Sequence, residues 1–227
     1  MKDLFGKAIL DFQTNNSPED ILTETNISEI DEMSVSYLFR NYNEMPKIEQ
    51  KALQLSKGKI LDIGCGAGSH SLFLQQKGFE VTSIDISENA IKACQLRCLK
   101  NAKVQNVLEL DNEKFDTILL LMNGTGIFQT ISECPKYLQK LKSILNPNGQ
   151  ILIDSSDIIY MYDDEDIPTN TYYGELTFTL FYKNQTENPF PWLYLDYNLL
   201  EKLAAENGLQ CELVQNGAHY DYLARLF

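Results

Sequence analysis

Three glycines at alternate positions, Gly64, Gly66 and Gly68, are residues whose type and spacing could do chemistry. They belong to the stretch LDIGCGAGSHSLFL, residues 61–74, between an apolar run and a segment with a helical pattern. Glycine in an ordered segment loses more conformational entropy than any other residue, so this cluster needs a compensating use. Two uses fit: a backbone with positive φ angles, or a ligand that comes too close to the backbone for side chains.

Two phosphate-binding patterns can be compared with this loop. A P-loop requires Gly-Lys-Ser/Thr, which does not occur in the sequence. A dinucleotide fingerprint GxGxxG requires a glycine where Ser69 stands. A nicotinamide-dependent oxidoreductase therefore stays as an alternative that this serine disfavours.

The elements that must position the loop alternate regularly from Lys59 onward. Apolar runs typical of strands alternate with helical patterns, which is the signature of βαβ units around a parallel sheet. Ser87 can cap the second helix of this series. The predicted strands cover 59–63, 79–86, 103–106, 114–121 and 150–156, and the predicted helices cover 69–78, 87–99 and 132–145.

The pattern changes beyond Ser156. A strand, a turn and a return strand predict an inserted β-hairpin at about 172–195, and its prolines confine the return strand to a sheet edge. A helix at 197–207 is followed by two strands around Asn216-Gly217, a strong hairpin signal. We therefore predict an α/β fold with a mostly parallel seven-stranded sheet that ends in an antiparallel hairpin, helices on both faces and one extra β-hairpin.

Composition limits the classes of function. The formal net charge of −13 over 227 residues repels phosphate backbones, so nucleic acid is not an expected partner. The longest apolar run is far shorter than the ~20 residues of a transmembrane helix, and the N-terminus lacks the apolar core of a signal peptide. We therefore expect a cytoplasmic protein without a membrane partner. Five cysteines without a CxxC pair, beside two histidines, predict neither a disulfide framework nor a metal site.

Four features occur together: Asp62 at a strand end, the glycine loop, Asp85 at the end of the second strand, and the terminal hairpin. This combination resembles the class I S-adenosylmethionine-dependent methyltransferases. The resemblance covers roughly residues 59–227, with LDIGCGAG as motif I. The segment before motif I, YLFRNYNEMPKIEQKAL, resembles a small, largely uncharacterised bacterial group of these enzymes. It implies a Rossmann-like fold that binds S-adenosylmethionine and releases S-adenosylhomocysteine. The implied parts are an N-terminal helical cap or lid at 1–57 and a methyltransferase domain at 58–227.

The resemblance also implies roles around the cofactor. The loop accepts the methionine part and the ribose, with Asp62 and loop carbonyls meeting the α-ammonium group. Asp85 accepts both ribose hydroxyls, because an ionised carboxylate accepts two hydrogen bonds at once. Asn123 lies near the sulfonium or forms a turn with Gly124, and His70 contacts the cofactor or packs in the core. The implied cofactor contacts are Asp62, Gly64, Cys65, Gly66, Gly68, His70, Asp85, Ile86, Asn106, Val107, Met122 and Asn123.

At the adenine position the sequence departs from the family. Members commonly place an acidic residue after the third strand to accept a hydrogen bond from the adenine amino group, whereas VQNVLEL has Asn106 there. The amide oxygen of Asn106 can accept that bond, and its NH2 group can donate to a ring nitrogen. Glu109 is the alternative acceptor.

The acceptor-binding candidates lie in two segments that usually cover the active site in this class, residues 37–45 and the aromatic-rich hairpin. Arg40 is either an anchor for a carboxylate or another anionic group, or the partner of an acidic residue in an ordinary ion pair. The aromatic side chains either bind a cationic group or simply pack. The candidates are Phe39, Arg40, Tyr160 and Trp192.

The resulting prediction is an enzyme that transfers a methyl group by in-line displacement to a small-molecule acceptor. The protein supplies proximity, alignment and a dry site, and no metal is required. The sequence does not rank the possible general bases, which are Asp154, Asp157, His219 and several tyrosines. The alternative from another class is a non-catalytic S-adenosylmethionine-binding partner protein, which would keep the loop and Asp85 but present a blocked acceptor pocket.

Overall fold

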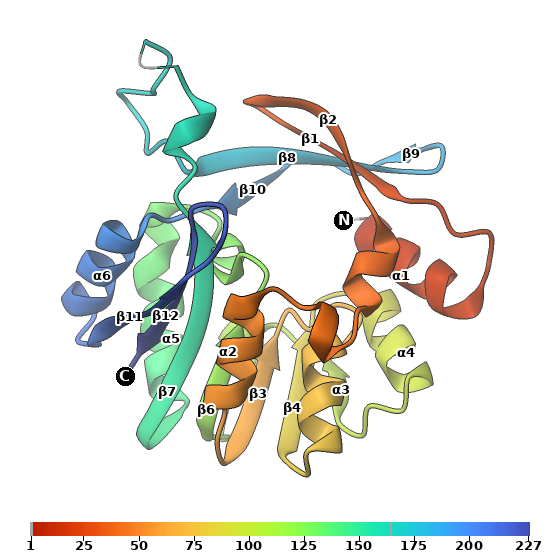
Figure 1. Cartoon of the computed structure of the whole chain (residues 1–227), viewed down its shortest axis with the longest axis horizontal. Helices are drawn as coiled ribbons and strands as arrows, with labels where there is room; N and C mark the ends of the chain where they lie inside the picture. Colours follow the sequence, from red (N-terminus) through yellow and green to blue (C-terminus); the bar gives the residue numbers. More distant parts are fainter. Residues whose placement is uncertain (1, 164) are drawn as a thin grey trace.

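Two β-sheets organise the chain, as Figure 1 shows for a computed structural model that describes residues 2–163 and 165–227. The larger sheet has seven strands in the order β11-β12-β7-β6-β3-β4-β5. Its strands are β3 (Lys59–Ile63), β4 (Glu80–Asp85), β5 (Ala102–Val104), β6 (Phe115–Leu120), β7 (Leu145–Ser156), β11 (Cys211–Asn216) and β12 (Asp221–Leu226).

The pairing in the larger sheet confirms the predicted fold class. Strands β3 to β7 pair in parallel, whereas β12 runs antiparallel to β7 and pairs with β11 in a terminal hairpin. The chain passes from β3 to β4 on one side and returns to β6 on the other, so the direction of winding reverses beside β3. In open α/β sheets ligands bind outside the carboxyl ends of the strands at such a reversal.

Helices cover both faces of this sheet, because its strands bury apolar side chains on both sides. Ile60 and Leu152 of the sheet pack in one cluster with α2 and α3, and their neighbours in the strands, Leu61 and Ile151, pack in another with α5 and α6. The helices are α1 (Leu4–Thr14), α2 (Lys47–Leu55), α3 (Ser69–Gln76), α4 (Glu88–Leu96), α5 (Cys134–Ser143) and α6 (Tyr197–Glu206), and the 3-10 turns are η1 (Val35–Phe39), η2 (Tyr42–Glu44), η3 (Val107–Glu109), η4 (Gly124–Phe128), η5 (Ile131–Glu133) and η6 (Ile159–Met161).

The second sheet shows that the N-terminal segment, expected to be a helical cap, also contains two strands, and that these pair with the predicted inserted hairpin. The strand order is β10-β8-β1-β2, with β9 also paired to β8, so the N-terminal hairpin and the inserted hairpin form one sheet. The free edge of β8 offers unpaired backbone groups, and β1 satisfies them in antiparallel register, Leu22 opposite Phe181. The strands are β1 (Ile21–Thr25), β2 (Ser28–Met33), β8 (Glu175–Tyr182), β9 (Gln185–Thr186) and β10 (Phe190–Leu193).

The second sheet lies across the carboxyl ends of the parallel strands (Figure 1). Helix α1 lies beside α4, where Ile9 and Leu38 pack with Ala67 of the glycine loop and Ala90 of α4. The end of the larger sheet at which a ligand is expected is therefore covered by N-terminal and inserted elements together. Within the described residues no helix is long and apolar enough to cross a membrane.

Candidate active site

The glycine loop between β3 and α3 has a left-handed backbone at all three alternate glycines. The φ angles of Gly64, Gly66 and Gly68 are 68°, 51° and 81°. A Cβ atom at Gly68 would come 2.5 Å from Leu99, whereas at Gly64 it would meet no atom within 4 Å and at Gly66 only Ile9, at 3.9 Å. All three glycines therefore have the positive φ angles considered for the loop, Gly68 also has no room for a side chain, and the backbone at Gly64 and Gly66 has open space beside it.

Asp85 holds this loop in place from the end of β4. Its Oδ2 accepts a hydrogen bond of 2.9 Å from the backbone N–H of Gly66, and its Oδ1 accepts one of 2.9 Å from Ser87. Burial raises the pKa of the Asp85 carboxyl, and these two backbone donors offset part of that rise. Each carboxylate oxygen has a second lone pair, so Asp85 can still accept hydroxyl groups from a ligand.

Asp62 lies under the loop in β3. Its Oδ2 accepts a 2.6 Å hydrogen bond from Ser71 of α3, whose own hydroxyl oxygen accepts one of 2.6 Å from Ser83 in β4. Burial raises the pKa of Asp62, and the Ser71 bond and the charge of His70 oppose that effect. Asp62 thus places a buried acidic group beneath the loop and ties it to α3.

Arg40, Glu49 and His70 form a buried cluster beside the loop. Arg40 Nη2 donates to both Glu49 oxygens at 2.5 Å, and His70 Nε2 is 2.6 Å from Glu49 Oε2. Burial lowers the pKa of His70, but the bond to Glu49 and the charge of Asp62 outweigh burial and raise it. Burial likewise acts to raise the pKa of Glu49, but His70 and Arg40 hold it below its ordinary value. The ion pair weighed for Arg40 from the sequence is therefore present, and Glu49 is a residue that the sequence reasoning missed.

Phe39 packs inside the cover over the loop. Its ring centroid is 4.6 Å from that of Phe12 in α1, and the Arg97 guanidinium lies 4.7 Å from the Phe39 ring centre. Arg97 also donates from Nη1 to the carbonyl of Ala67. Phe39 thus connects the N-terminal segment to the glycine loop through Arg97.

The loop after β6 is the second irregular segment at this edge. Met122 and Asn123 both have left-handed backbones, with φ angles of 68° and 58°. Asp154 of β7 holds them by accepting the N–H groups of Met122 at 3.1 Å and Gly124 at 2.9 Å. Burial raises the pKa of Asp154 to about 6 despite these bonds. The Asn123 side chain accepts a hydrogen bond from Ser155 Oγ at 3.0 Å.

The Asn106 side chain, expected at the adenine position, forms a hydrogen bond within its own turn. The Asn106 Oδ1 accepts the backbone N–H of Leu108 at 3.0 Å at the start of η3, while Val107 is buried in the core. Glu109 is exposed at the end of the same turn. Ile86, directly after Asp85, exposes 63% of its surface, which is unusual for an isoleucine and leaves an apolar side chain available to a ligand.

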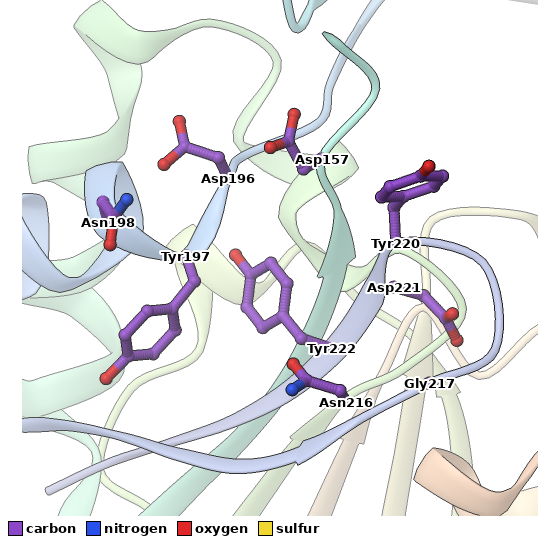
Figure 2. Close-up of a pocket in the computed structure, with 9 residues that line it drawn as sticks. All are labelled: Asp157, Asp196, Tyr197, Asn198, Asn216, Gly217, Tyr220, Asp221 and Tyr222. Carbon is purple, nitrogen blue, oxygen red and sulfur yellow. The ribbon is translucent and has the colours of Figure 1, made fainter. Parts of the chain in front are cut away.

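A cavity of about 330 Å³ opens further along the same edge, where β7 ends, α6 begins and the β11–β12 hairpin turns (Figure 2). The strand order places β7 two strands away from β3, so this cavity is distinct from the space over the glycines. Its walls combine carboxylates with tyrosines and short amides. They are formed by Asp157, Asp196, Tyr197, Asn198, Asn216, Gly217, Tyr220, Asp221 and Tyr222.

Two carboxylates of the cavity are held by tyrosines that the sequence reasoning did not connect. Tyr173 donates to Asp157 at 2.8 Å, and Tyr172 donates to Asp196 at 2.8 Å. Burial raises the pKa of both tyrosines, so they remain protonated donors. The signal for Asp196 was present in the sequence, because an aspartate directly before YNLL is a typical helix cap, and Asp196 caps α6 through Leu199.

The remaining candidates lie on either side of this edge. Tyr160 stacks on Tyr220 at 4.8 Å between ring centroids, beside the cavity. Trp192 of β10 lies on the loop after β6, so closely that a Cβ atom at Gly126 would come 2.0 Å from the indole ring. Among the possible bases, Asp157 faces the cavity, Asp154 is buried under the loop after β6, and His219 is exposed on the terminal hairpin.

Three features define the class I methyltransferase fold. They are a mostly parallel sheet with an antiparallel terminal hairpin, a glycine loop after the first parallel strand, and an acidic residue at the end of the second strand. The chain belongs to the methyltransferase domain family, which matches residues 54–213.

Known relatives agree with this assignment. A crystal structure of an S-adenosylmethionine-dependent methyltransferase from Bacteroides fragilis, in complex with S-adenosylhomocysteine, is 41% identical, covers 100% of this chain and 94% of its own, and has a TM-score of 0.92. The PH0226 protein of Pyrococcus horikoshii, 20% identical over 79% of this chain and 87% of its own, shares the fold with a TM-score of 0.62.

Curated sequences match over shorter regions. The ubiquinone biosynthesis O-methyltransferase of Rickettsia prowazekii is 27% identical over 114 residues, which are 48% of this chain and 44% of that protein. The chain spans about half the length of the curated relatives it matches.

Proposed function

We propose that the protein is an S-adenosylmethionine-dependent methyltransferase that acts on a small molecule. One observation carries the proposal: the backbone at Gly64 and Gly66 has open space beside it and is held by the Asp85 carboxylate, next to the winding reversal of the sheet. The Bacteroides fragilis relative binds S-adenosylhomocysteine, the product of such a transfer, on the same fold.

The residues of the chain suit the parts of this cofactor. Asp85 has lone pairs left for the two ribose hydroxyls, and Ile86 offers an exposed apolar side chain to the adenine ring. Asn106 or Glu109 accepts from the adenine amino group. Asp62 supplies negative charge under the loop for the α-ammonium group. The bound cofactor supplies a methyl carbon activated by its positive sulfur.

The protein contributes position and a dry environment to the transfer. We assign residues 1–57 as a cover, since Ile9 lies against the glycine loop and Arg97 holds Phe39 there. The second sheet joins this cover to the inserted hairpin, so both close the same end of the larger sheet. Excluding water and aligning the acceptor with the methyl–sulfur bond lowers the barrier of an in-line displacement.

The acceptor side is assigned to the cavity of Figure 2 and the aromatic residues beside it, Tyr160 and Trp192. Asp157 is the candidate base, because its carboxylate lines the cavity and Tyr173 orients it. The net charge of −13 favours a small-molecule acceptor over nucleic acid. A non-catalytic cofactor-binding protein would bind S-adenosylmethionine equally well but produce no S-adenosylhomocysteine with any acceptor.

Calorimetry with S-adenosylhomocysteine and NAD tests the cofactor, and a matched pair of variants tests the loop. Gly64 and Gly78 both have left-handed backbones with no atom within 4 Å of an added Cβ, so Gly64→Ala and Gly78→Ala carry similar backbone strain of about 1–2 kcal/mol. We expect S-adenosylhomocysteine to bind, NAD not to bind, and only Gly64→Ala to weaken the binding. Equal affinities in the two variants, or tighter binding of NAD, would contradict the assignment.

A turnover assay distinguishes a methyltransferase from a non-catalytic S-adenosylmethionine-binding protein. The wild-type chain, incubated with S-adenosylmethionine and a panel of small alcohols, amines and acids, should release S-adenosylhomocysteine with at least one class. Binding without turnover across the panel would favour the non-catalytic alternative.

A further inference from the structure

The inner face of the second sheet carries aromatic side chains that the chain leaves partly uncovered. In β8, Leu180 and Tyr182 pack against α1. Phe178 lies on the same face, because side chains two positions apart in a strand point to the same side. Leu176 and Leu180, before and after it on this face, are each 4% exposed, whereas Phe178 is only half-buried. Part of the Phe178 ring is therefore not covered by the rest of the chain.

Three aromatic side chains at the end of the inserted hairpin lie around Phe178. Phe190 of β10 is directly opposite Phe178 in the ladder, so the two share a face. Trp192 and Tyr194 follow Phe190 at steps of two. The ring centroids of Phe190, Trp192 and Tyr194 are 6.2, 6.4 and 6.5 Å from that of Phe178. All four side chains are half-buried, and we call them the aromatic patch.

Tyr194 adds an unused hydroxyl group to the aromatic patch. Two other tyrosines whose pKa is raised by burial, Tyr172 and Tyr222, donate to Asp196 and to the Leu195 carbonyl. The Tyr194 hydroxyl has no hydrogen-bond partner within residues 2–163 and 165–227. Burial raises the pKa of Tyr194 to about 12, so the group stays protonated near neutral pH. It is therefore free both to donate a hydrogen bond to a ligand and to accept one.

The aromatic patch lies beside the loop after β6. Trp192 packs against Gly126 of η4, and the charge of Asp154, which holds that loop, acts on the Tyr194 hydroxyl. The second sheet itself lies across the carboxyl ends of the parallel strands, as Figure 1 shows. The patch is therefore at the end of the larger sheet where we propose that the methyl donor binds.

We propose that the aromatic patch binds an uncharged aromatic ring of the methyl acceptor, and that the Tyr194 hydroxyl bonds to a hydroxyl group on that ring. The Tyr194 ring is inclined by 25° to that of Phe178 and the Trp192 ring by 65°. A flat ring can therefore stack on some of these side chains and meet others edge-on, the two arrangements that aromatic pairs prefer. The inference rests on the proposed function and names the chemistry of the acceptor beside Trp192.

The same residues favour an uncharged ring over a charged one. The patch contains no charged side chain, and two of its four rings are phenylalanines, which attract cations less strongly than tryptophan does. The carboxylate of Asp154 already accepts the N–H groups of Met122 and Gly124, one on each oxygen. An anionic acceptor would be repelled by the same carboxylate.

The fluorescence of Trp192, the only tryptophan in the sequence, reports on ligands at the patch. The full chain, saturated with S-adenosylhomocysteine, is titrated with three probes of similar size: 4-methylphenol, 4-methylcyclohexanol and benzylamine. We expect 4-methylphenol to change the emission and to bind about tenfold more tightly than the other two. The saturated alcohol lacks the flat ring, and the amine is positively charged and lacks the hydroxyl group.

Two substitutions test the ring and the hydroxyl group separately. Tyr194→Phe keeps the ring, so it should weaken 4-methylphenol about fivefold and leave the affinity for S-adenosylhomocysteine within about twofold. Phe178→Leu removes a flat ring and should reduce the preference for 4-methylphenol over 4-methylcyclohexanol to about threefold or less. Tyr137→Phe is the control, because it removes a tyrosine hydroxyl from α5, and it should change none of these affinities.

Three results would overturn the inference while leaving the proposed function standing. They are equal or tighter binding of the amine or the saturated alcohol, an unchanged affinity for 4-methylphenol in Tyr194→Phe, and no binding of any probe to a chain that binds S-adenosylhomocysteine. A wild-type chain that does not bind S-adenosylhomocysteine would overturn the proposed function, and this inference with it.

Discussion

At the scale of single residues, three aspartates at the ends of parallel strands act on the loops beside them. Asp85 accepts the N–H of Gly66, Asp154 accepts the N–H groups of Met122 and Gly124, and Asp62 binds α3. A carboxylate can accept several hydrogen bonds at once, so it can shape a loop of left-handed residues and still face a ligand. Acidic residues at this edge therefore have a structural role in addition to any contact with a cofactor.

Replacing Asp85 tests how these two roles divide. Asp85→Ala removes the acceptor for Gly66 and, in the proposed site, the acceptor for two ribose hydroxyls, so we expect S-adenosylhomocysteine binding to weaken by about 2–4 kcal/mol. Asp116→Ala is the control, because Asp116 also accepts a backbone N–H, that of Lys59 at 2.7 Å, at the opposite end of the strands. Calorimetry should show a loss of affinity for the first variant only. An unchanged affinity in a folded Asp85→Ala would remove Asp85 from the site.

At the scale of elements, the Ser155 hydroxyl is one of the groups that fasten the second sheet to the larger one. Ser155 of β7 donates to Asn123 at 3.0 Å, accepts the N–H of Leu195 at 2.9 Å and lies 2.7 Å from the Thr125 hydroxyl. Thr125 in turn donates to the Leu193 carbonyl at 2.9 Å. The end of β10 and the loop after β6 are therefore held in one buried network.

Removing that hydroxyl should loosen the second sheet selectively. Ser155→Ala leaves the buried N–H of Leu195 and part of the Asn123 amide without partners, so the free energy of unfolding should fall by about 2–3 kcal/mol. Hydrogen exchange should increase at residues 190–195 more than in β3. Ser143→Ala, which removes an exposed hydroxyl bound to Lys140, should change neither quantity. Uniform exchange throughout the chain would show that the network does not hold the second sheet in particular.

At the scale of the whole molecule, the buried groups give stability a characteristic pH dependence. The pKa of Asp154 is raised from 3.8 to about 6, so the folded state binds a proton between these values that the unfolded state does not. Stability from Asp154 is therefore lost as the pH rises from about 4 to about 6. The pKa of His70 is also raised in the folded state. Its contribution to stability is therefore complete below pH 6.5 and is lost as the pH rises through the pKa of the folded state.

The free energy of unfolding should accordingly fall as the pH rises from 4.5 to 7.5. Chemical denaturation at one-unit pH intervals measures this change. Asp154→Asn should flatten the pH dependence of the free energy of unfolding below about pH 6. His70→Gln should flatten it above about pH 6.5. In each case one titrating group is removed. A wild-type stability that increases over this range would contradict the assigned directions. Below about 4.5 the slope should reverse, because Glu49, whose pKa is lowered, then loses its charge.

The sequence by itself determined the parallel core of this protein. The alternation of strand and helix patterns, the glycine loop, Asp85 at the end of its strand and the Ser87 cap are local features, and Ser87 accepts the Ala90 N–H as predicted. Each depends on residues close together in the chain, where hydrophobic period and turn chemistry act directly. The terminal hairpin around Asn216-Gly217 belongs to the same group.

Only the tertiary structure decided which distant segments meet. The acid-rich strands at 21–33 become a sheet because the free edge of β8, more than 140 residues later, offers them backbone partners. Arg40 acquires Glu49 and His70 as neighbours because η1, α2 and α3 converge beside the loop. Neither meeting leaves a period or a motif in the sequence, since pairing across sheet edges and buried ion pairs depends on which surfaces the whole fold brings together.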